Sequence, residues 1–249
     1  MLVDAHTHLD QYKENQIDGV IEEINRNRIL TLSNSMDIES YFKNLEISCK
    51  SKFIIPSFGI HPWKALDYYN KLDILEEHIY NSKIIGEIGL DFYWTDNSLK
   101  NKEAQIKVFE FFLHRAKKED KFINIHTKGA EKEILESLYK FKIDKAIIHW
   151  YSGPFDILYK LIDRGYFFTV SSQVIYSEQI KSVAKAIPIE KLLTETDNPG
   201  GEEWLSGRRG RPLLIREVLN GLSEIRDYSI EEIEKTIEKN ISIVLLNNN

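Results

Sequence analysis

Cysteine is nearly absent from this chain of 249 residues, and Cys49 is its single representative. One thiol excludes an internal disulfide framework and any metal site built from several thiolates. No apolar run approaches the roughly 20 residues that a transmembrane helix needs, so we expect no membrane span. The first residues also lack the basic stretch and the apolar stretch of a secretion signal. Together these absences predict a cytoplasmic protein.

Positive charge is also in short supply. The chain has 33 lysines and arginines against 39 aspartates and glutamates, which gives a formal net charge of −6. This balance argues against a wide basic surface for nucleic acid, so an enzyme acting on nucleic acid would have to concentrate its positive charge locally. The glycine-rich dinucleotide fingerprint is missing after the first expected strand, so a nicotinamide cofactor has no support.

Short apolar or β-branched runs alternate along the chain with longer stretches of helical periodicity. The strand-like runs are residues 2–8, 29–33, 53–60, 83–89, 122–126, 146–149, 166–171 and 191–196. Helical spacing occurs over residues 17–28, 99–118 and 130–141, among others. This number of strand–helix units in ~250 residues is typical of a TIM-type barrel. We therefore predict the α/β class and a (β/α)8 barrel, with residues 1–249 as a single domain and an open doubly wound sheet as the rival.

Histidines gather at the expected strand ends. His6 and His8 lie two residues apart at the end of the first run, and residues i and i+2 of a strand point to the same face. Further histidines end later runs, namely His61, His126 and His149. Because the carboxyl ends of barrel strands meet at the face that holds the active site, we expect these imidazoles to converge.

Two carboxylates stand in similar positions. Glu87 lies within the apolar run between Ile85 and Ile88, where a bare charge is costly unless a metal binds it. Asp197 follows the last expected strand. Imidazoles and carboxylates suit Zn²⁺, Mn²⁺ and similar ions, and this donor set exceeds what one tetrahedral site needs. The surplus predicts two divalent metal ions bridged by a carboxylate, with Asp197 as the base that takes a proton from the attacking water.

Six short sequences together resemble those of a known family. They are Asp4-Ala5-His6-Thr7-His8-Leu9-Asp10, Gly59-Ile60-His61-Pro62-Trp63, Gly86-Glu87-Ile88-Gly89-Leu90-Asp91, His126-Thr127-Lys128, His149-Trp150-Tyr151-Ser152-Gly153 and Glu195-Thr196-Asp197-Asn198-Pro199. In this order and spacing, from residue 3 to the C-terminal helix, the chain resembles the TatD family of metal-dependent deoxyribonucleases. That family belongs to the amidohydrolase-like barrels.

The resemblance implies a two-metal centre at the C-terminal ends of the strands of a (β/α)8 barrel. By this resemblance the ligands of the first ion are His6, His8, Glu87 and Asp197, and Glu87 bridges to a second ion that His126 and His149 complete. It makes Glu87 and Asp197 the catalytic carboxylates and leaves the metal open among Zn²⁺, Mn²⁺ and Mg²⁺. It also implies hydrolysis of phosphodiester bonds in DNA, often by a 3′–5′ exonuclease.

Two departures from the family pattern concern the substrate. Lys128 stands where the family often has arginine, and the family's Arg-Asn-Glu-Pro element is replaced by a more basic loop at residues 207–212. We expect this loop to contact phosphates and so to supply the local positive charge. The expected substrate contacts are His61, Lys128, Ser152, Arg208, Arg209 and Arg211. The expected base-stacking residues, in loops on the same face, are Trp63, Tyr93, Trp94, Trp150 and Trp204, and they favour a single-stranded or frayed end.

Other interpretations stay open from the sequence. The same centre would serve an amidohydrolase-like enzyme that cleaves a small amide, lactone or ester, or aminoacyl-tRNA, and a barrel can also be used for binding alone. His61 either contacts substrate or braces its loop, Asp197 can cap the turn before Pro199, and the basic loop can be solvated surface. We expect DNA as the substrate, no obligate protein partner, and a monomer or weak oligomer.

Overall fold

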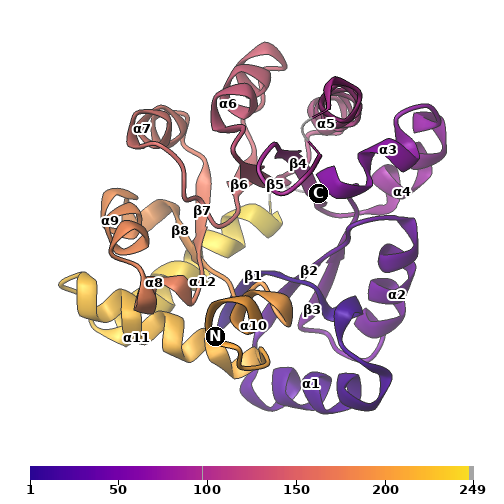
Figure 1. The fold of residues 1–249 in the computed structure, drawn as a ribbon. Helices are drawn as coiled ribbons and strands as arrows, with labels where there is room; N and C mark the ends of the chain where they lie inside the picture. The colour runs from indigo at the N-terminus through magenta and orange to yellow at the C-terminus, as the bar shows by residue number, and fades with distance from the viewer. Residues whose placement is uncertain (97, 247–249) are drawn as a thin grey trace.

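Eight parallel strands form the centre of the molecule in residues 1–96 and 98–246, the part of the chain described by a computed structural model (Figure 1). They are β1 (Val3–Thr7), β2 (Leu30–Asn34), β3 (Ile54–Ser57), β4 (Ile85–Asp91), β5 (Ile123–Lys128), β6 (Ala146–Ile148), β7 (Phe167–Val170) and β8 (Leu192–Thr194). Each strand matches one of the runs expected from the sequence. The largest difference is at β3, where Phe58 has left the ladder and keeps only an isolated bridge to Ile85.

The strands make two sheets, β1-β2-β3 and β4-β5-β6-β7-β8. Every paired strand is parallel to its neighbour, and neighbours in space are consecutive in the sequence. A doubly wound open sheet would instead reverse its strand order partway along. The strand order therefore confirms the barrel and rejects the open sheet.

Two seams close the sheets around a common axis. β8 runs beside β1, and just beyond β8 the backbone N–H of Asp197 donates to the carbonyl of His6 at 2.9 Å. On the other side, the N–H of Gly86 in β4 donates to the carbonyl of Phe58 after β3, also at 2.9 Å. The seams are short and irregular, and both pass beside the ends of strands that carry the expected ligands.

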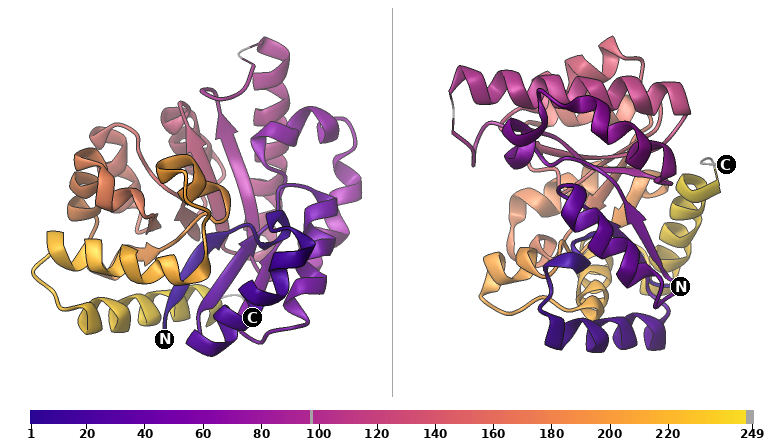
Figure 2. Two further views of the ribbon diagram at one scale, coloured as in Figure 1. Left: turned by 60° about the horizontal axis from the view of Figure 1, so that its bottom comes forward. Right: turned by 90° about the vertical axis from the view of Figure 1, so that its right-hand side faces the viewer.

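Helices surround the strands (Figures 1 and 2). They are α1 (Glu14–Asn27), α2 (Ile38–Ser48), α3 (Ala65–Tyr68), α4 (Glu76–Asn81), α5 (Leu99–Glu119), α6 (Glu131–Lys140), α7 (Phe155–Asp163), α8 (Gln173–Tyr176), α9 (Glu178–Ala186), α10 (Gly200–Ser206), α11 (Ile215–Ile225) and α12 (Ile230–Leu246). Asn240 of α12 donates to the carbonyls of Ile189 and Leu192, so α12 lies at the amino end of β8, opposite the ligands. No helix in the described residues is both long and apolar enough to cross a membrane.

The longest helix shows how the sequence sets local structure. Ser98 caps α5 by accepting a hydrogen bond from the N–H of Asn101 at 3.3 Å, and the helix ends at Asp120 in the left-handed conformation. Its buried residues are Asn101, Ala104, Gln105, Val108, Phe109, Phe112, Leu113 and Ala116. Ile106, at helical spacing from the buried Phe109 and Leu113, is only half-buried because the buried face is centred further round the helix.

The strands are buried on both faces, inside against the barrel interior and outside against helices. All seven residues of β4 are buried. Burial on both faces explains why strands such as β6 and β7 carry apolar residues in succession. Polar residues inside such strands are therefore exceptions, and the main ones, His6, Glu87 and Asn124, turn toward a single site.

Candidate metal centre

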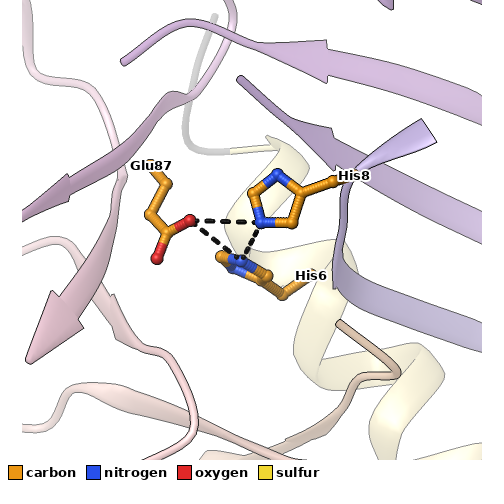
Figure 3. A group of neighbouring side chains, drawn as sticks. All are labelled: His6, His8 and Glu87. Carbon is orange, nitrogen blue, oxygen red and sulfur yellow. Dashed lines mark hydrogen bonds and ion pairs between the residues drawn. The ribbon is translucent and has the colours of Figure 1, made fainter. Parts of the chain in front are cut away.

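The end of β1 presents two imidazoles to the barrel axis (Figure 3). The Nε2 atoms of His6 and His8 lie 3.3 Å apart, and they are 3.4 and 3.3 Å from Glu87 Oε2. Asp197 Oδ1, from the turn after β8, lies 3.7 Å from Nε2 of His6 and 3.3 Å from Nε2 of His8. These four groups, which the family resemblance assigns to the first ion, thus meet at one point.

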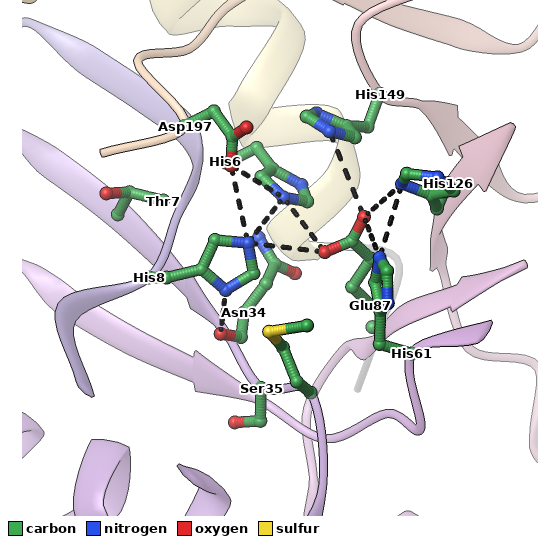
Figure 4. Close-up of polar contacts among 12 residues, drawn as sticks. His6, Thr7, His8, Asn34, Ser35, His61, Glu87, His126, His149 and Asp197 are labelled. Atoms are coloured by element: carbon green, nitrogen blue, oxygen red, sulfur yellow. Dashed lines mark hydrogen bonds and ion pairs between the residues drawn. The ribbon is translucent and has the colours of Figure 1, made fainter. Parts of the chain in front are cut away.

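The other oxygen of Glu87 faces a second group of imidazoles (Figure 4). Glu87 Oε1 is 2.9 Å from Nδ1 of His126, 3.8 Å from Nε2 of His149 and 3.6 Å from Nε2 of His61. The two oxygens of one carboxylate therefore face two groups of histidines, as a carboxylate that bridges two ions must. The ligand atoms of His61, Glu87 and His126 lie within 4.8 Å of one another, so proximity alone would admit His61 as a ligand.

Acceptors outside the site fix the rings of three of these histidines. Nδ1 of His6 lies 3.0 Å from Asn124 Oδ1, Nδ1 of His8 lies 3.0 Å from the Asn34 carbonyl, and Nδ1 of His149 lies 2.6 Å from Glu195 Oε2. The Nδ2 of Asn124 donates to the Ala5 carbonyl at 3.0 Å, which identifies its Oδ1 as the acceptor. An acceptor at Nδ1 holds a proton there, so Nε2 is the nitrogen that gives up its proton and offers its lone pair when a metal binds. This is the tautomer that a metal ligand needs.

Asp91, at the end of β4, lies on the outer side of the His126 ring. Its Oδ2 lies 3.3 Å from Nε2 of His126, while Nδ1 of that ring faces the bridging carboxylate. Asp91 Oδ2 also accepts the indole N–H of Trp63 at 2.7 Å. Its Oδ1 accepts the backbone N–H groups of Tyr93 and Trp94 at 2.9 and 2.8 Å. One buried carboxylate therefore joins the ligand group to the aromatic residues beside it.

Both inward carboxylates are held ionised. Burial opposes the charge of Glu87, but the surrounding imidazoles, among them His6 and His126, lower its pKa well below the usual range. Burial also opposes the charge of Asp197, and the hydrogen bond from His8 outweighs it and lowers the pKa of Asp197. Two adjacent buried anions form a site that favours cations.

The imidazoles divide by charge. Burial lowers the pKa of His61 to about 3 and that of His149 well below its usual value, so these rings are neutral. Burial also disfavours the charged form of His126, but Asp91 and Glu87 raise its pKa to about 9. Burial raises the pKa of Glu195 to about 8, and a cation bound at the far side of His149 would oppose that rise.

Protons and metal ions compete for such donors, and the set of imidazoles and carboxylates fits a divalent ion such as Zn²⁺ or Mn²⁺.

A cavity of about 580 Å³ opens above the ligands. All four tryptophans of the chain line it, namely Trp63, Trp94, Trp150 and Trp204. The Trp204 ring stands nearly edge to face with Trp94 at 6.4 Å and with Trp150 at 6.2 Å. Trp63 lies in a 3-10 turn (Pro62–Lys64) and Trp204 in α10, so these two are not in irregular loops as the sequence suggested. Tyr93 packs against Trp94 at 4.7 Å.

The expected substrate contacts fall into two groups. Lys128 lines the cavity, and its Nζ donates to Ser152 Oγ at 3.0 Å. His61 lines the same cavity. These residues lie together beside the ligands, within reach of one bound molecule.

The basic loop is placed differently. Arg208 forms an ion pair with Glu202 at 2.7 Å, and Arg211 forms one with Glu23 at 2.8 Å. The guanidinium of Arg209 lies over the ring of Tyr12, 5.9 Å from its centroid. Among the described residues that line the cavity, none of the three arginines occurs. The fold brings carboxylates close to Arg208 and Arg211 and pairs their charges. Little unpaired positive charge is therefore left near the cavity.

Sequence reasoning gave no role to three buried residues that orient ligands, namely Asp91, Asn124 and Glu195. A signal for two of them was present. Asn124 and Glu195 stand two residues before His126 and Asp197, and the i, i+2 spacing of a strand places each on the same inward face as that proposed ligand, where they meet His6 and His149. Asp91 gives no such spacing signal, because its partners come from separate elements.

The barrel and the buried donor set together define a metal-dependent hydrolase with its active site at the carboxyl ends of the strands. The chain belongs to the family described as TatD related DNase, whose model matches residues 3–245. This confirms the resemblance seen in the sequence.

Named relatives agree with this membership. An uncharacterized metal-dependent hydrolase of Methanocaldococcus jannaschii is 29% identical and covers 96% of this chain and 94% of its own length. Human deoxyribonuclease TATDN3 is 25% identical, covering 96% of this chain and 92% of its own length.

Solved structures share the fold. The TatD homologue YJJV of Escherichia coli superposes with a TM-score of 0.86 at 20% identity, covering 98% of this chain and 97% of its own. The phosphotriesterase of Mycobacterium tuberculosis superposes with a TM-score of 0.70 at 12% identity, covering 98% and 93%.

Proposed function

We propose that the protein hydrolyses phosphodiester bonds at the 3′ ends of DNA, as a metal-dependent exonuclease that prefers single-stranded or frayed ends. One observation carries the proposal, namely that Glu87 directs its two oxygens to two groups of histidines at the floor of a cavity lined by tryptophans. The deoxyribonuclease name of a relative supports DNA as the substrate. We further propose that it acts in the cytoplasm, as a monomer or weak oligomer.

Two metal ions fit the donor groups. The proposed ligands are His6, His8, Glu87 and Asp197 for one ion, and Glu87, His126 and His149 for the other. Bound divalent ions supply an activated water and hold the attacked phosphoryl group. Asp197 is the proposed base, because its side chain keeps 21% of its surface exposed toward the cavity against 2% for Glu87.

The cavity supports a terminal nucleotide as its occupant. A volume of about 580 Å³ suits a molecule of that size and is too small for a duplex. Exposed indole faces bind bases of any sequence by stacking, at about 1–3 kcal/mol each. Lys128 supplies a positive charge for a phosphate, and Ser152 supplies a hydroxyl beside it. Arg208, Arg209 and Arg211 enter the proposal only as outer contacts, since Arg208 and Arg211 would have to exchange carboxylates for phosphates.

The test uses the purified protein and a single-stranded oligonucleotide labelled at its 5′ end. With Mn²⁺, Zn²⁺ or Mg²⁺ we expect a ladder of products shortened from the 3′ end, and excess chelator should abolish it. Asp197→Ala should lower kcat by at least about 100-fold, as loss of a general base does. Asp163→Ala, at an exposed position at the end of α7, is the matched control and should leave kcat unchanged.

Two results would overturn the proposal. One is full activity in excess chelator. The other is the absence of oligonucleotide cleavage together with metal-dependent turnover of a small ester or lactone, or of aminoacyl-tRNA, by the same preparation. That second result would assign the centre to the amidohydrolase-like alternative.

A further inference from the structure

His61 shares the cavity floor with the four histidines proposed as ligands, but its outward-facing nitrogen accepts a hydrogen bond where theirs face acceptors. Its Nδ1 accepts the backbone N–H of Trp63 at 3.2 Å, so His61 caps the 3-10 turn over Pro62–Lys64. A neutral imidazole that accepts at Nδ1 carries its proton on Nε2. His61 therefore directs an N–H group, and no lone pair, toward the site.

This contrast separates His61 from the ligands. His6, His8 and His149 have acceptors at Nδ1, so Nε2 faces inward as the nitrogen that can offer its lone pair to a metal. Nε2 of His61 lies 3.4 Å from Nδ1 of His126 and 3.6 Å from the nearer oxygen of the bridging carboxylate. Proximity would make His61 a fifth imidazole ligand, but a protonated nitrogen has no lone pair to give a metal.

The surroundings hold the ring in this state. Pro62 has no N–H, so the first free donor of the turn is the N–H of Trp63, and His61 Nδ1 is its partner. The Trp63 ring packs edge-on against His61 at 4.8 Å, and its indole N–H is fixed on Asp91. The backbone N–H of His61 donates to the Met36 carbonyl at 2.9 Å. His61 is 3% exposed, so water has little access to the nitrogen that bonds to Trp63.

We propose that His61 is a fixed hydrogen-bond donor, whose Nε2–H binds a non-bridging oxygen of the scissile phosphate. This inference rests on the proposed function. A donor held in place inside a buried site stabilises charge that develops on that oxygen without having to reorganise during the reaction. His61 is then a catalytic residue that contacts substrate, and the metal ligands remain the four histidines with inward lone pairs.

Two substitutions separate the donor from the cap. In His61→Asn the amide oxygen can take the place of Nδ1 and cap the turn, but the chain is too short to put a donor at the position of Nε2. In His61→Gln the amide N–H reaches that position. We expect His61→Asn to keep the wild-type melting temperature and the wild-type bound metal, measured by elemental analysis, while kcat falls about 100-fold. His61→Gln should recover at least part of that loss.

A second measurement does not depend on DNA cleavage. In metal-loaded protein with ¹⁵N-labelled histidine, long-range ¹H–¹⁵N spectra should show a protonated Nε2 and a bare Nδ1 for His61, and the reverse for His6, His8 and His149. Calorimetric titration with inorganic phosphate should show weaker binding to His61→Asn than to wild type. If DNA is not cleaved but these results hold, the donor stands and the choice of substrate is wrong.

Three outcomes would overturn the inference. Loss of a metal equivalent in His61→Asn would make His61 a ligand. Wild-type kcat and phosphate affinity in His61→Asn would mean that His61 only caps the turn over Pro62–Lys64. A bare Nε2 in the spectra would remove the donor itself.

Discussion

At the scale of single residues, one hydrogen bond on the outer side of each imidazole decides what its inner side can do. Glu195 holds Nδ1 of His149 at 2.6 Å, and the backbone of Trp63 donates to Nδ1 of His61 at 3.2 Å. The two rings share the same cavity floor and present opposite groups to it. On the proposed assignment, the partners outside the site determine which histidines can act as ligands.

Glu195→Gln should weaken metal binding about 10- to 100-fold, because a side-chain amide holds the ring of His149 less firmly and raises its basicity less than a carboxylate does. Isothermal titration of the metal-free variant with Zn²⁺ or Mn²⁺ measures the change. Glu190→Gln, at an exposed position shortly before β8, is the control and should bind metal as wild type does. Unchanged affinity in Glu195→Gln would show that the contact does not support the ligand.

The sequence predicted which histidines and carboxylates converge better than it predicted the charges around them. A ligand such as His126 follows an apolar run, and strand periodicity together with barrel geometry brings such residues to one face. The pairing of Arg211 with Glu23 joins residues 188 positions apart, and no local pattern encodes it. The basic loop therefore looked free in the sequence and is partly neutralised in the fold.

At the scale of elements, the close approach of the chain after β3 to β4 shapes the site. A Cβ on Gly59 would lie 2.4 Å from the carbonyl oxygen of Glu87, so only glycine allows the two backbones to come this near. Sequence patterns predicted both strands, because their apolar runs are clear. They did not predict this contact, because it depends on how the two sheets meet.

Gly59→Ala should destabilise the protein by about 3 kcal/mol or more, since the new methyl group would force Glu87 and its strand away. Chemical denaturation followed by circular dichroism measures the loss, and metal content should fall with it. The matched control is Gly19→Ala within α1, where a Cβ meets no atom within 4 Å. That variant should be more stable than wild type by about 0.5–1 kcal/mol, because alanine favours a helix. Equal stabilities of the two variants would contradict the packing argument.

At the scale of the whole molecule, the proposed ligands come from both sheets. His6 and His8 belong to the sheet of β1-β2-β3 and its end, whereas Glu87, His126 and Asp197 belong to or follow strands of the other sheet. The seams between the sheets carry few backbone hydrogen bonds. An ion bound by both groups would therefore link the two sheets across the seams between them.

Metal binding should accordingly raise the melting temperature. At free metal 100 times above Kd, binding adds about 2.7 kcal/mol to the free energy of unfolding, provided that the unfolded chain does not bind metal. For a chain of this size that corresponds to a rise of roughly 5–10 °C. Scanning calorimetry with and without chelator measures the rise, and a variant carrying both His6→Ala and His8→Ala should lose most of it. Binding without any rise would mean that the metal does not link the sheets.

The four tryptophans that line the cavity give this protein an optical property. The chain has no other tryptophan, so its tryptophan fluorescence, excited at a wavelength that tyrosine does not absorb, arises entirely from the walls of the cavity. A nucleotide that stacks on an indole quenches its emission, and the helices and strands elsewhere contribute no background. The unmodified protein is thus its own sensor for whatever enters the site, and a ligand that leaves the emission unchanged binds outside the cavity.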